Sequence, residues 1–204
     1  MSAPRIRRWW FVGALFGAAI LAAAFLCDAA VQTWVVQHQT PSALGLMRFV
    51  TKWGDWPTHV AAGVLGAAIA YALGKREWLV IFAAMVIACA VAGSVNRVIK
   101  VTAGRSRPSV KVERGWNGPS AKSDYHAFPS GHTAASTAFF AALVFARRRI
   151  GLALLPNPLL IAASRIYLNA HYLSDVVFAA MLGIACAALV WYFAARQPVL
   201  RPSG

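Results

Sequence analysis

Three short segments of the chain carry residues suited to phosphate chemistry. The first, KVTAGRSRP, begins at Lys100 and includes Arg107, and the second, PSGH, covers residues 129–132. The third, SRIYLNAHYLSD, covers residues 164–175 and supplies Arg165, a histidine and an aspartate. Arginine side chains suit the paired oxygens of a phosphate group, and lysine adds a compact positive charge. The three segments therefore predict a site that binds phosphate.

A helix that starts at Gly131 would add backbone donors to this site. Ser130 and the amides of Gly131 and His132 would open the helix, where free N–H groups and the positive end of the dipole attract anions. His132 and His171 then remain to move protons or to attack phosphorus. The combination predicts phosphoryl transfer.

The two histidines differ in their neighbours. His171 and Asp175 are four residues apart, a spacing that places both on one face of a helix. A carboxylate bonded to one imidazole nitrogen fixes the tautomer, frees the other nitrogen and stabilises the positive ring. His132 has no carboxylate at helical spacing. The pattern predicts His171 as an oriented nucleophile and His132 as the proton donor to the leaving oxygen.

Each feature also has a simpler structural explanation. A histidine at a helix start is often a polar cap, and a His–Asp pair at helical spacing is often structural. Basic residues near a membrane commonly bind lipid headgroups, which is our interpretation of Lys111, Arg114 and Lys122. The chemical interpretation depends on the combination, because cations, a helix start and two histidines are expected on one membrane face.

The composition indicates an integral membrane protein. Hydrophobic residues make up 59% of the 204 residues and charged residues 13%, too few to coat a soluble domain of this length. The net charge of +14 would suggest nucleic acid binding on a soluble chain. Here the basic residues form short clusters between apolar runs, as in loops beside anionic lipid. The three cysteines lie in or beside apolar runs and predict neither a disulfide framework nor a metal site.

The apolar runs predict six transmembrane helices in a single membrane-embedded domain, residues 1–204. A span needs about 20 mostly apolar residues. Uncharged runs of that kind cover residues 9–26, 78–95 and 176–195, and weaker ones cover 57–73, 131–146 and 150–168. The first run could instead be a signal peptide, but it exceeds the usual length of a signal core.

Basic loops predict the orientation. With six spans, four basic clusters fall on one side, which the positive-inside rule makes cytoplasmic. They are Arg5, Arg7 and Arg8; Lys75 and Arg76; Arg147, Arg148 and Arg149; and Arg196 and Arg201. The loop 101–128 then lies outside although it is basic, which indicates that its charges have a role other than topology. The three motifs all fall at the outer ends of their helices, where they can converge.

These motifs resemble those of the type-2 phosphatidic acid phosphatase superfamily, which also includes bacterial acid phosphatases and vanadium haloperoxidases. The family pattern is Lys, six residues and Arg-Pro; then Pro-Ser-Gly-His; then Ser-Arg, five residues, His, three residues and Asp. Every fixed position is present here, from Lys100 to Asp175. The resemblance covers residues 100–183 by motif, and the six-span layout extends it to the whole chain.

The resemblance implies an all-α integral membrane protein with a haloperoxidase-like helical core. It also implies a phosphohistidine mechanism without a metal or other cofactor. His171 would attack phosphorus with Asp175 behind it, His132 would protonate the leaving group, and water would then release phosphate. The implied phosphate-binding residues are Lys100, Arg107, Ser130, Gly131 and Arg165.

The leading functional hypothesis is a lipid phosphatase of the bacterial cytoplasmic (inner) membrane, with its site facing the periplasm or outside. Candidate substrates are undecaprenyl diphosphate, phosphatidylglycerophosphate, phosphatidic acid and the 1-phosphate of lipid A. A lipid phosphotransferase with the same site and a non-enzymatic transporter are the alternatives, and haloperoxidase activity ranks below them. The expected partners are a lipid phosphate or diphosphate and the bilayer, without nucleic acid; the sequence does not identify protein partners.

Overall fold

The structure, a computed structural model, describes residues 3–110 and 115–200, with side chains from Phe11 onward. Lys111, Arg114 and Arg201 lie outside the described residues, as do the side chains of Arg5, Arg7 and Arg8. The regular elements of the described part are all helical. They are α1 (Ala3–His38), α2 (Pro41–Trp53), α3 (Trp56–Ala72), α4 (Arg76–Ala103), η1 (Ser123–Tyr125), α5 (Gly131–Ala146), α6 (Arg148–Leu154), α7 (Pro156–Tyr167), α8 (Leu173–Ala194) and η2 (Pro198–Leu200).

Four stretches of helix are long and apolar enough to cross a membrane: residues 11–38, 76–103, 148–167 and 173–194. The described chain is therefore all-α with membrane-spanning character, as expected. The helices α3, with 17 residues, and α5, with 16, are shorter. The count of six spans stays a prediction.

The first helix runs further than the sequence analysis expected. The apolar run ends near residue 26, yet α1 continues to His38 and includes Asp28. No glycine or proline interrupts residues 27–40, and Pro41 then disfavours helical backbone at Thr40. Thr40 instead caps α2 by accepting a hydrogen bond from the Ala43 amide. The extension of α1 brings Asp28 into the bundle.

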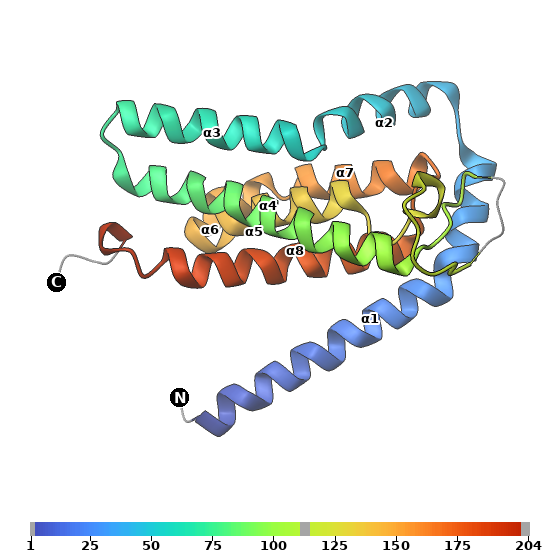
Figure 1. Cartoon of the computed structure of the whole chain (residues 1–204), viewed down its shortest axis with the longest axis horizontal. Helices are drawn as coiled ribbons and strands as arrows, with labels where there is room; N and C mark the ends of the chain where they lie inside the picture. The colour runs from blue at the N-terminus through green and yellow to red at the C-terminus, as the bar shows by residue number, and fades with distance from the viewer. Residues whose placement is uncertain (1–2, 111–114, 201–204) are drawn as a thin grey trace.

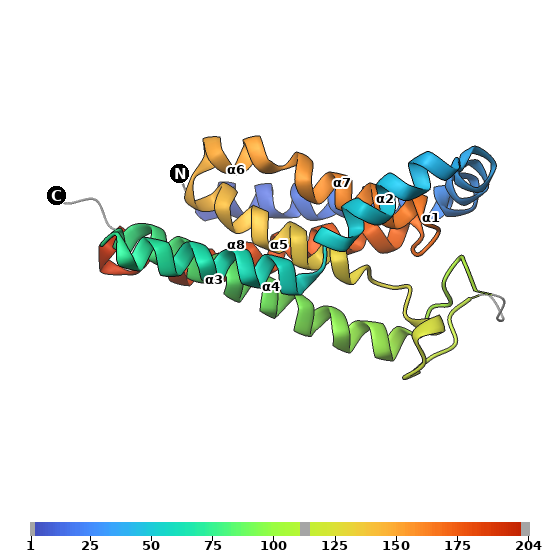
Figure 2. The same ribbon diagram turned by 90° about the horizontal axis from the view of Figure 1, so that it is seen from above.

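The central helix of the bundle is α5, which packs against α4, α6, α7 and α8 (Figure 2). Its buried face is rich in alanine, and Phe139 fills the core beside Ile81 and Met85 of α4. A Cβ atom at Gly183 of α8 would lie 2.8 Å from the carbonyl oxygen of Ala134. Small residues thus allow α5 and α8 to approach each other closely.

One end of the bundle gathers the segments named in the sequence analysis. The C-terminal ends of α1 and α4 lie there with the long α4–α5 connection (Figure 1). The helix α4 is capped at its C-terminal end by Gly104, whose φ of 57° is left-handed. A Cβ atom at Gly104 would lie 1.6 Å from the carbonyl oxygen of Gly118, so only glycine fits this turn. The turn directs the chain after α4 back across the bundle end.

Candidate functional site

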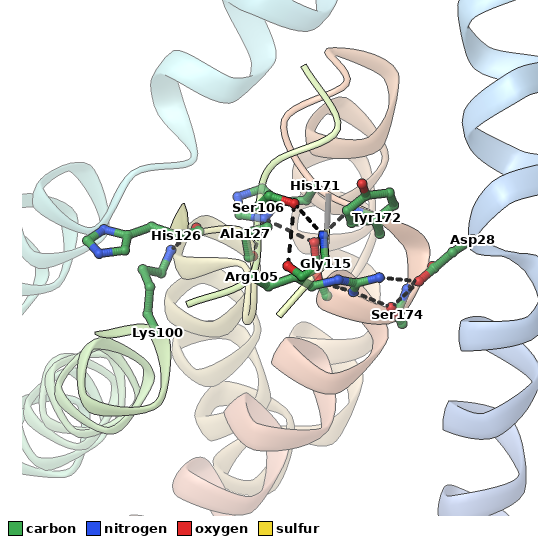
Figure 3. A network of polar contacts seen from close by, with 11 residues as sticks. Asp28, Lys100, Arg105, Ser106, Gly115, His126, Ala127, His171, Tyr172 and Ser174 are labelled. Carbon is green, nitrogen blue, oxygen red and sulfur yellow. Dashed lines mark hydrogen bonds and ion pairs between the residues drawn. The ribbon is translucent and has the colours of Figure 1, made fainter. Parts of the chain in front are cut away.

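His171 is buried in the connection between α7 and α8, with 3% of its surface exposed. Its Nδ1 atom lies 2.6 Å from the carbonyl oxygen of Ala127 (Figure 3). A carbonyl can only accept, so Nδ1 carries the proton and Nε2 keeps its lone pair. Burial lowers the pKa of His171 to about 4, and Asp175 opposes this shift. The ring is therefore neutral at pH 7, with one nitrogen available for attack.

Asp175 does not orient His171 in the way that its helical spacing predicted. His171 precedes α8, which begins at Leu173, so the two residues are not on one helix face. The Oδ2 atom of Asp175 lies 3.7 Å from Nδ1 of His171, which is ion-pair rather than hydrogen-bond distance. The same oxygen accepts the Tyr172 amide at 2.8 Å and caps α8. Ala127 fixes the tautomer instead, and Asp175 supplies charge.

His132 has a carboxylate partner that sequence spacing did not indicate. It is the second residue of α5, and its Nε2 atom lies 4.0 Å from Oδ1 of Asp55. Asp55 is the N-cap residue of α3 and accepts the Trp56 amide at 2.9 Å. His132 and His171 lie close enough to repel each other electrostatically, so the two histidines belong to one site.

The predicted cations come from three elements. Lys100 lies in the last turn of α4, Arg165 in the last turn of α7 and Arg107 in the α4–α5 connection. Lys100 repels both arginines electrostatically, so the three positive charges face a common region. Lys100 also donates a hydrogen bond to the carbonyl oxygen of His126 at 3.2 Å. Three converging cations favour a phosphate group between them.

The start of α5 lies beside these cations. A Cβ atom at Gly131 would lie 3.8 Å from Nζ of Lys100, which places the first helical amides next to that charge. Ser130 is fully buried, and its amide donates to the carbonyl oxygen of Asp175 at 3.1 Å. Its side chain does not cap the helix but accepts a hydrogen bond from Thr133 at 3.0 Å. The amides at this helix start remain suited to an anion.

His126, which the sequence left as a residue of the polar loop, is buried. Its Nε2 atom lies 2.9 Å from the carbonyl oxygen of Ser120, and its own carbonyl accepts from Lys100. His126 therefore closes a turn within the α4–α5 connection and, through its carbonyl, ties that connection to the end of α4. It supports Lys100 through the backbone.

Two charged residues of the bundle end were missed in the sequence analysis. Arg105 lies between the expected Lys100 and Arg107, and it forms ion pairs with Asp175 and with Asp28 of α1 (Figure 3). The chain has only six acidic residues, and a carboxylate beside an apolar span is costly unless it has a partner. The presence of one of these few acidic residues, Asp28, directly after an apolar span was therefore the signal in the sequence that it has a buried partner.

A cavity of about 680 Å³ opens between α3 and α4 next to His132. Its polar end holds Lys100, Arg97 and Asp55, and its other end holds the apolar Val60 and Ala90. Ten residues separate Ala90 from Lys100 along α4, or about 15 Å of helix. The cavity therefore joins the cationic site to an apolar region between α3 and α4.

Comparison with known proteins places this site in a family. The profile of the PAP2 superfamily matches residues 77–198. The chain belongs to the PAP2 superfamily. It is also 34% identical, over 170 residues, to the decaprenylphosphoryl-5-phosphoribose phosphatase of Mycobacterium tuberculosis, strains CDC 1551 / Oshkosh and H37Rv. That alignment covers 79% of this chain and 85% of the relative.

Two solved PAP2 structures share the fold. One is a transmembrane PAP2 type phosphatidylglycerolphosphate phosphatase from Bacillus subtilis, with TM-score 0.70 and 21% identity over 92% of this chain and 96% of that one. The other is LpxE of Aquifex aeolicus, with TM-score 0.55 and 20% identity over 80% of this chain and 93% of that one. The family resemblance seen in the motifs is confirmed, and the chain is a membrane-type PAP2 phosphatase, a phosphoric monoester hydrolase.

Proposed function

We propose that this PAP2 protein hydrolyses the terminal phosphate of a membrane lipid through a phosphohistidine intermediate on His171. The observation that carries the proposal is the hydrogen bond from His171 Nδ1 to Ala127, which leaves Nε2 as an unprotonated nucleophile. Lys100, Arg107 and Arg165 surround the same region with positive charge. A neutral nucleophile among cations suits attack on an anionic phosphate.

In the first step, Nε2 of His171 forms a bond to phosphorus while the bond to the leaving oxygen breaks. His132, which is protonated once the anionic phosphate lies beside it and Asp55, gives its proton to that oxygen. The positive charge that develops on the His171 ring is stabilised by Asp175, 3.7 Å from Nδ1. The phosphoryl oxygens are held by the side chains of Lys100, Arg107 and Arg165 and by the backbone N–H groups of Gly131 and His132 at the start of α5.

In the second step, water attacks the phosphorus and the N–P bond breaks. His132, now neutral, accepts the proton from that water, and phosphate leaves with both ring nitrogens of His171 restored to their starting state.

Among the described residues, the Nε atom of Arg165 is buried without a hydrogen-bond partner. A buried unsatisfied donor of this kind favours a bound anion.

The cavity between α3 and α4 supports a lipid substrate. Its polar end lies at Lys100 and His132, and its apolar end at Val60 and Ala90 could hold the start of a hydrocarbon tail. We place this site at the outer leaflet of the bacterial inner membrane, because four basic clusters assign the opposite helix ends to the cytoplasm.

The M. tuberculosis relative makes a polyprenyl-phosphoribose 5-phosphate the first substrate to examine. The test measures phosphate released by purified protein in detergent from a panel of lipid phosphates. The panel contains that substrate, undecaprenyl diphosphate, phosphatidylglycerophosphate, phosphatidic acid and a lipid A 1-phosphate. We expect release without any added acceptor alcohol, and radiolabelled phosphate trapped on His171 by rapid quenching. Release that requires an acceptor would show a phosphotransferase, and a wild-type rate in His171→Asn would refute the mechanism.

A further inference from the structure

Arg105 and Asp28 form a buried ion pair directly behind Asp175. Each of the two residues has 8% of its surface exposed. The Nη2 atom of Arg105 donates to Oδ2 of Asp28 at 2.7 Å, and its Nη1 atom donates to Oδ1 of Asp175 at 2.5 Å. The guanidinium also lies over the ring of Tyr172, 4.1 Å from its centre. One arginine therefore joins α1 to the carboxylate that faces His171.

Asp28 is also bonded to the first turn of α8. It accepts hydrogen bonds from the amide of Ser174 at 2.8 Å and from the hydroxyl of Ser174 at 2.5 Å. The same hydroxyl accepts a hydrogen bond from Arg105 at 2.7 Å (Figure 3). Asp28 thus fixes the helix turn that carries Asp175. It does so from α1, outside the region that the family profile matches.

The charges of this cluster determine what His171 experiences. Asp28 and Asp175 are negative and Arg105 is positive, so the three together carry one net negative charge. Without Asp28, the positive charge of Arg105 would offset that of Asp175. Burying charges is costly even when they are paired. Neutral side chains could join α1 to α8 without that cost, so attachment of the two helices does not by itself require three buried charges.

We propose that Asp28 and Arg105 are positioning residues that hold Asp175 beside His171 and preserve one net negative charge there. That charge stabilises the positive ring of the phosphohistidine, and α1 becomes part of the catalytic centre. The inference rests on the proposed nucleophilic role of His171.

Other charged or titratable groups also face His171 and must stay constant in any test. They come from α4, α5, α7 and α8, and are Lys100, His132, Arg165 and Asp175. The variants described below leave all four unchanged.

The test compares Asp28→Asn, Arg105→Gln and the double variant with wild type. Rapid quenching of purified protein in detergent measures the rate of phosphate transfer to His171 against pH, with one substrate throughout. The acid limb is the low-pH side of this profile, where protonation of His171 slows the transfer. In Asp28→Asn the net charge of the cluster becomes zero, which disfavours a protonated His171, so the acid limb should move to lower pH. In Arg105→Gln it becomes −2, so the limb should move to higher pH. Each shift should be about one pH unit, as expected for a unit charge roughly 10 Å away in partly buried surroundings.

The double variant restores the net charge of −1 but holds Asp175 less firmly. Its acid limb should therefore return to the wild-type position, while its phosphorylation rate falls about tenfold. Gln32→Ala is the matched control, because Gln32 lies one turn after Asp28 on the same side of α1. The control should match wild type in both rate and acid limb.

The outcomes separate this inference from the proposed function. No phosphate on His171 in wild type would overturn both. Phosphate on His171, with the acid limbs of both single variants at the wild-type position, would overturn only the role of Asp28 and Arg105. If a single variant does not fold, the double variant provides the test. Positions 28 and 105 are then both neutral, so neither leaves the other as an unpaired buried charge. A wild-type phosphorylation rate in that variant would overturn the inference.

Discussion

The Nδ1 atom of His171 lies 2.6 Å from the carbonyl oxygen of Ala127, 44 residues earlier in the chain. This bond selects the tautomer, while the Asp175 carboxylate remains 3.7 Å away. The connection between α4 and α5 therefore determines which nitrogen of His171 is unprotonated.

The first prediction concerns pH and stability. Burial lowers the pKa of His171 to about 4 in the folded protein, against about 6.5 in an unfolded chain. Between pH 6.5 and 4 the unfolded state binds a proton at this ring and the folded state does not, so folding is destabilised as pH falls. We expect the unfolding temperature of wild type to fall more steeply than that of His171→Asn across this range. Parallel curves from pH 7 to 4 would show that His171 titrates normally.

The second prediction concerns His132 as proton donor. His132→Ala should reduce turnover of a lipid phosphate by about 10²- to 10⁴-fold, the range for general acid catalysis. p-Nitrophenyl phosphate should be affected much less, because its leaving group needs little protonation. His171→Asn should abolish turnover of both substrates, since it removes the nucleophile. Equal losses on both substrates in His132→Ala would leave the two histidines without distinct roles.

The third prediction concerns Asp55, whose carboxylate lies 4.0 Å from His132 and whose side chain is 48% exposed. Asp55→Asn keeps a side chain that can cap α3 but removes the charge that favours a protonated His132. Turnover of a lipid phosphate should fall by about two- to five-fold, as expected for a partly exposed ion pair. The rate with p-nitrophenyl phosphate should be unchanged. An equal fall with both substrates would indicate a general role in binding.

The fourth prediction concerns orientation in the membrane. In a background where Cys27, Cys89 and Cys186 are replaced by alanine, a membrane-impermeant thiol reagent should label Ala121→Cys in intact cells. It should label Arg148→Cys only after lysis. Both positions are exposed, so access to the reagent decides the result. The reverse pattern would move the site to the cytoplasmic leaflet.

The fifth prediction concerns metal removal. In the proposed mechanism, Lys100, Arg107 and Arg165 neutralise the phosphate charge. Phosphate release should therefore continue in excess EDTA, and vanadate should inhibit it by imitating five-coordinate phosphorus. Complete loss of activity in EDTA, with recovery on addition of one metal ion, would contradict the mechanism.

Much of this protein was predictable because it depends on local sequence. Composition and long apolar runs indicated an all-α membrane protein, since the bilayer requires helices of that length. Fixed spacings from Lys100 to Asp175 identified the family, which the profile match confirms. The extent of α1 was predicted less well, because hydropathy does not reveal that a helix continues past the end of its apolar run.

The amino-acid sequence by itself determined the membrane class, the family and the residue types available for chemistry. Only the tertiary structure decided which of them meet. Arg105 and Arg107 belong to one short segment, yet Arg105 binds Asp175 while Arg107 donates to the backbone of Ser123. Ala127 and Asp28 reach the site from distant parts of the chain. The physical reason is that these contacts are made between segments far apart in the chain. The left-handed turn at Gly104 and the packing of the helices determine where each side chain lies, and residue spacing encodes neither of them.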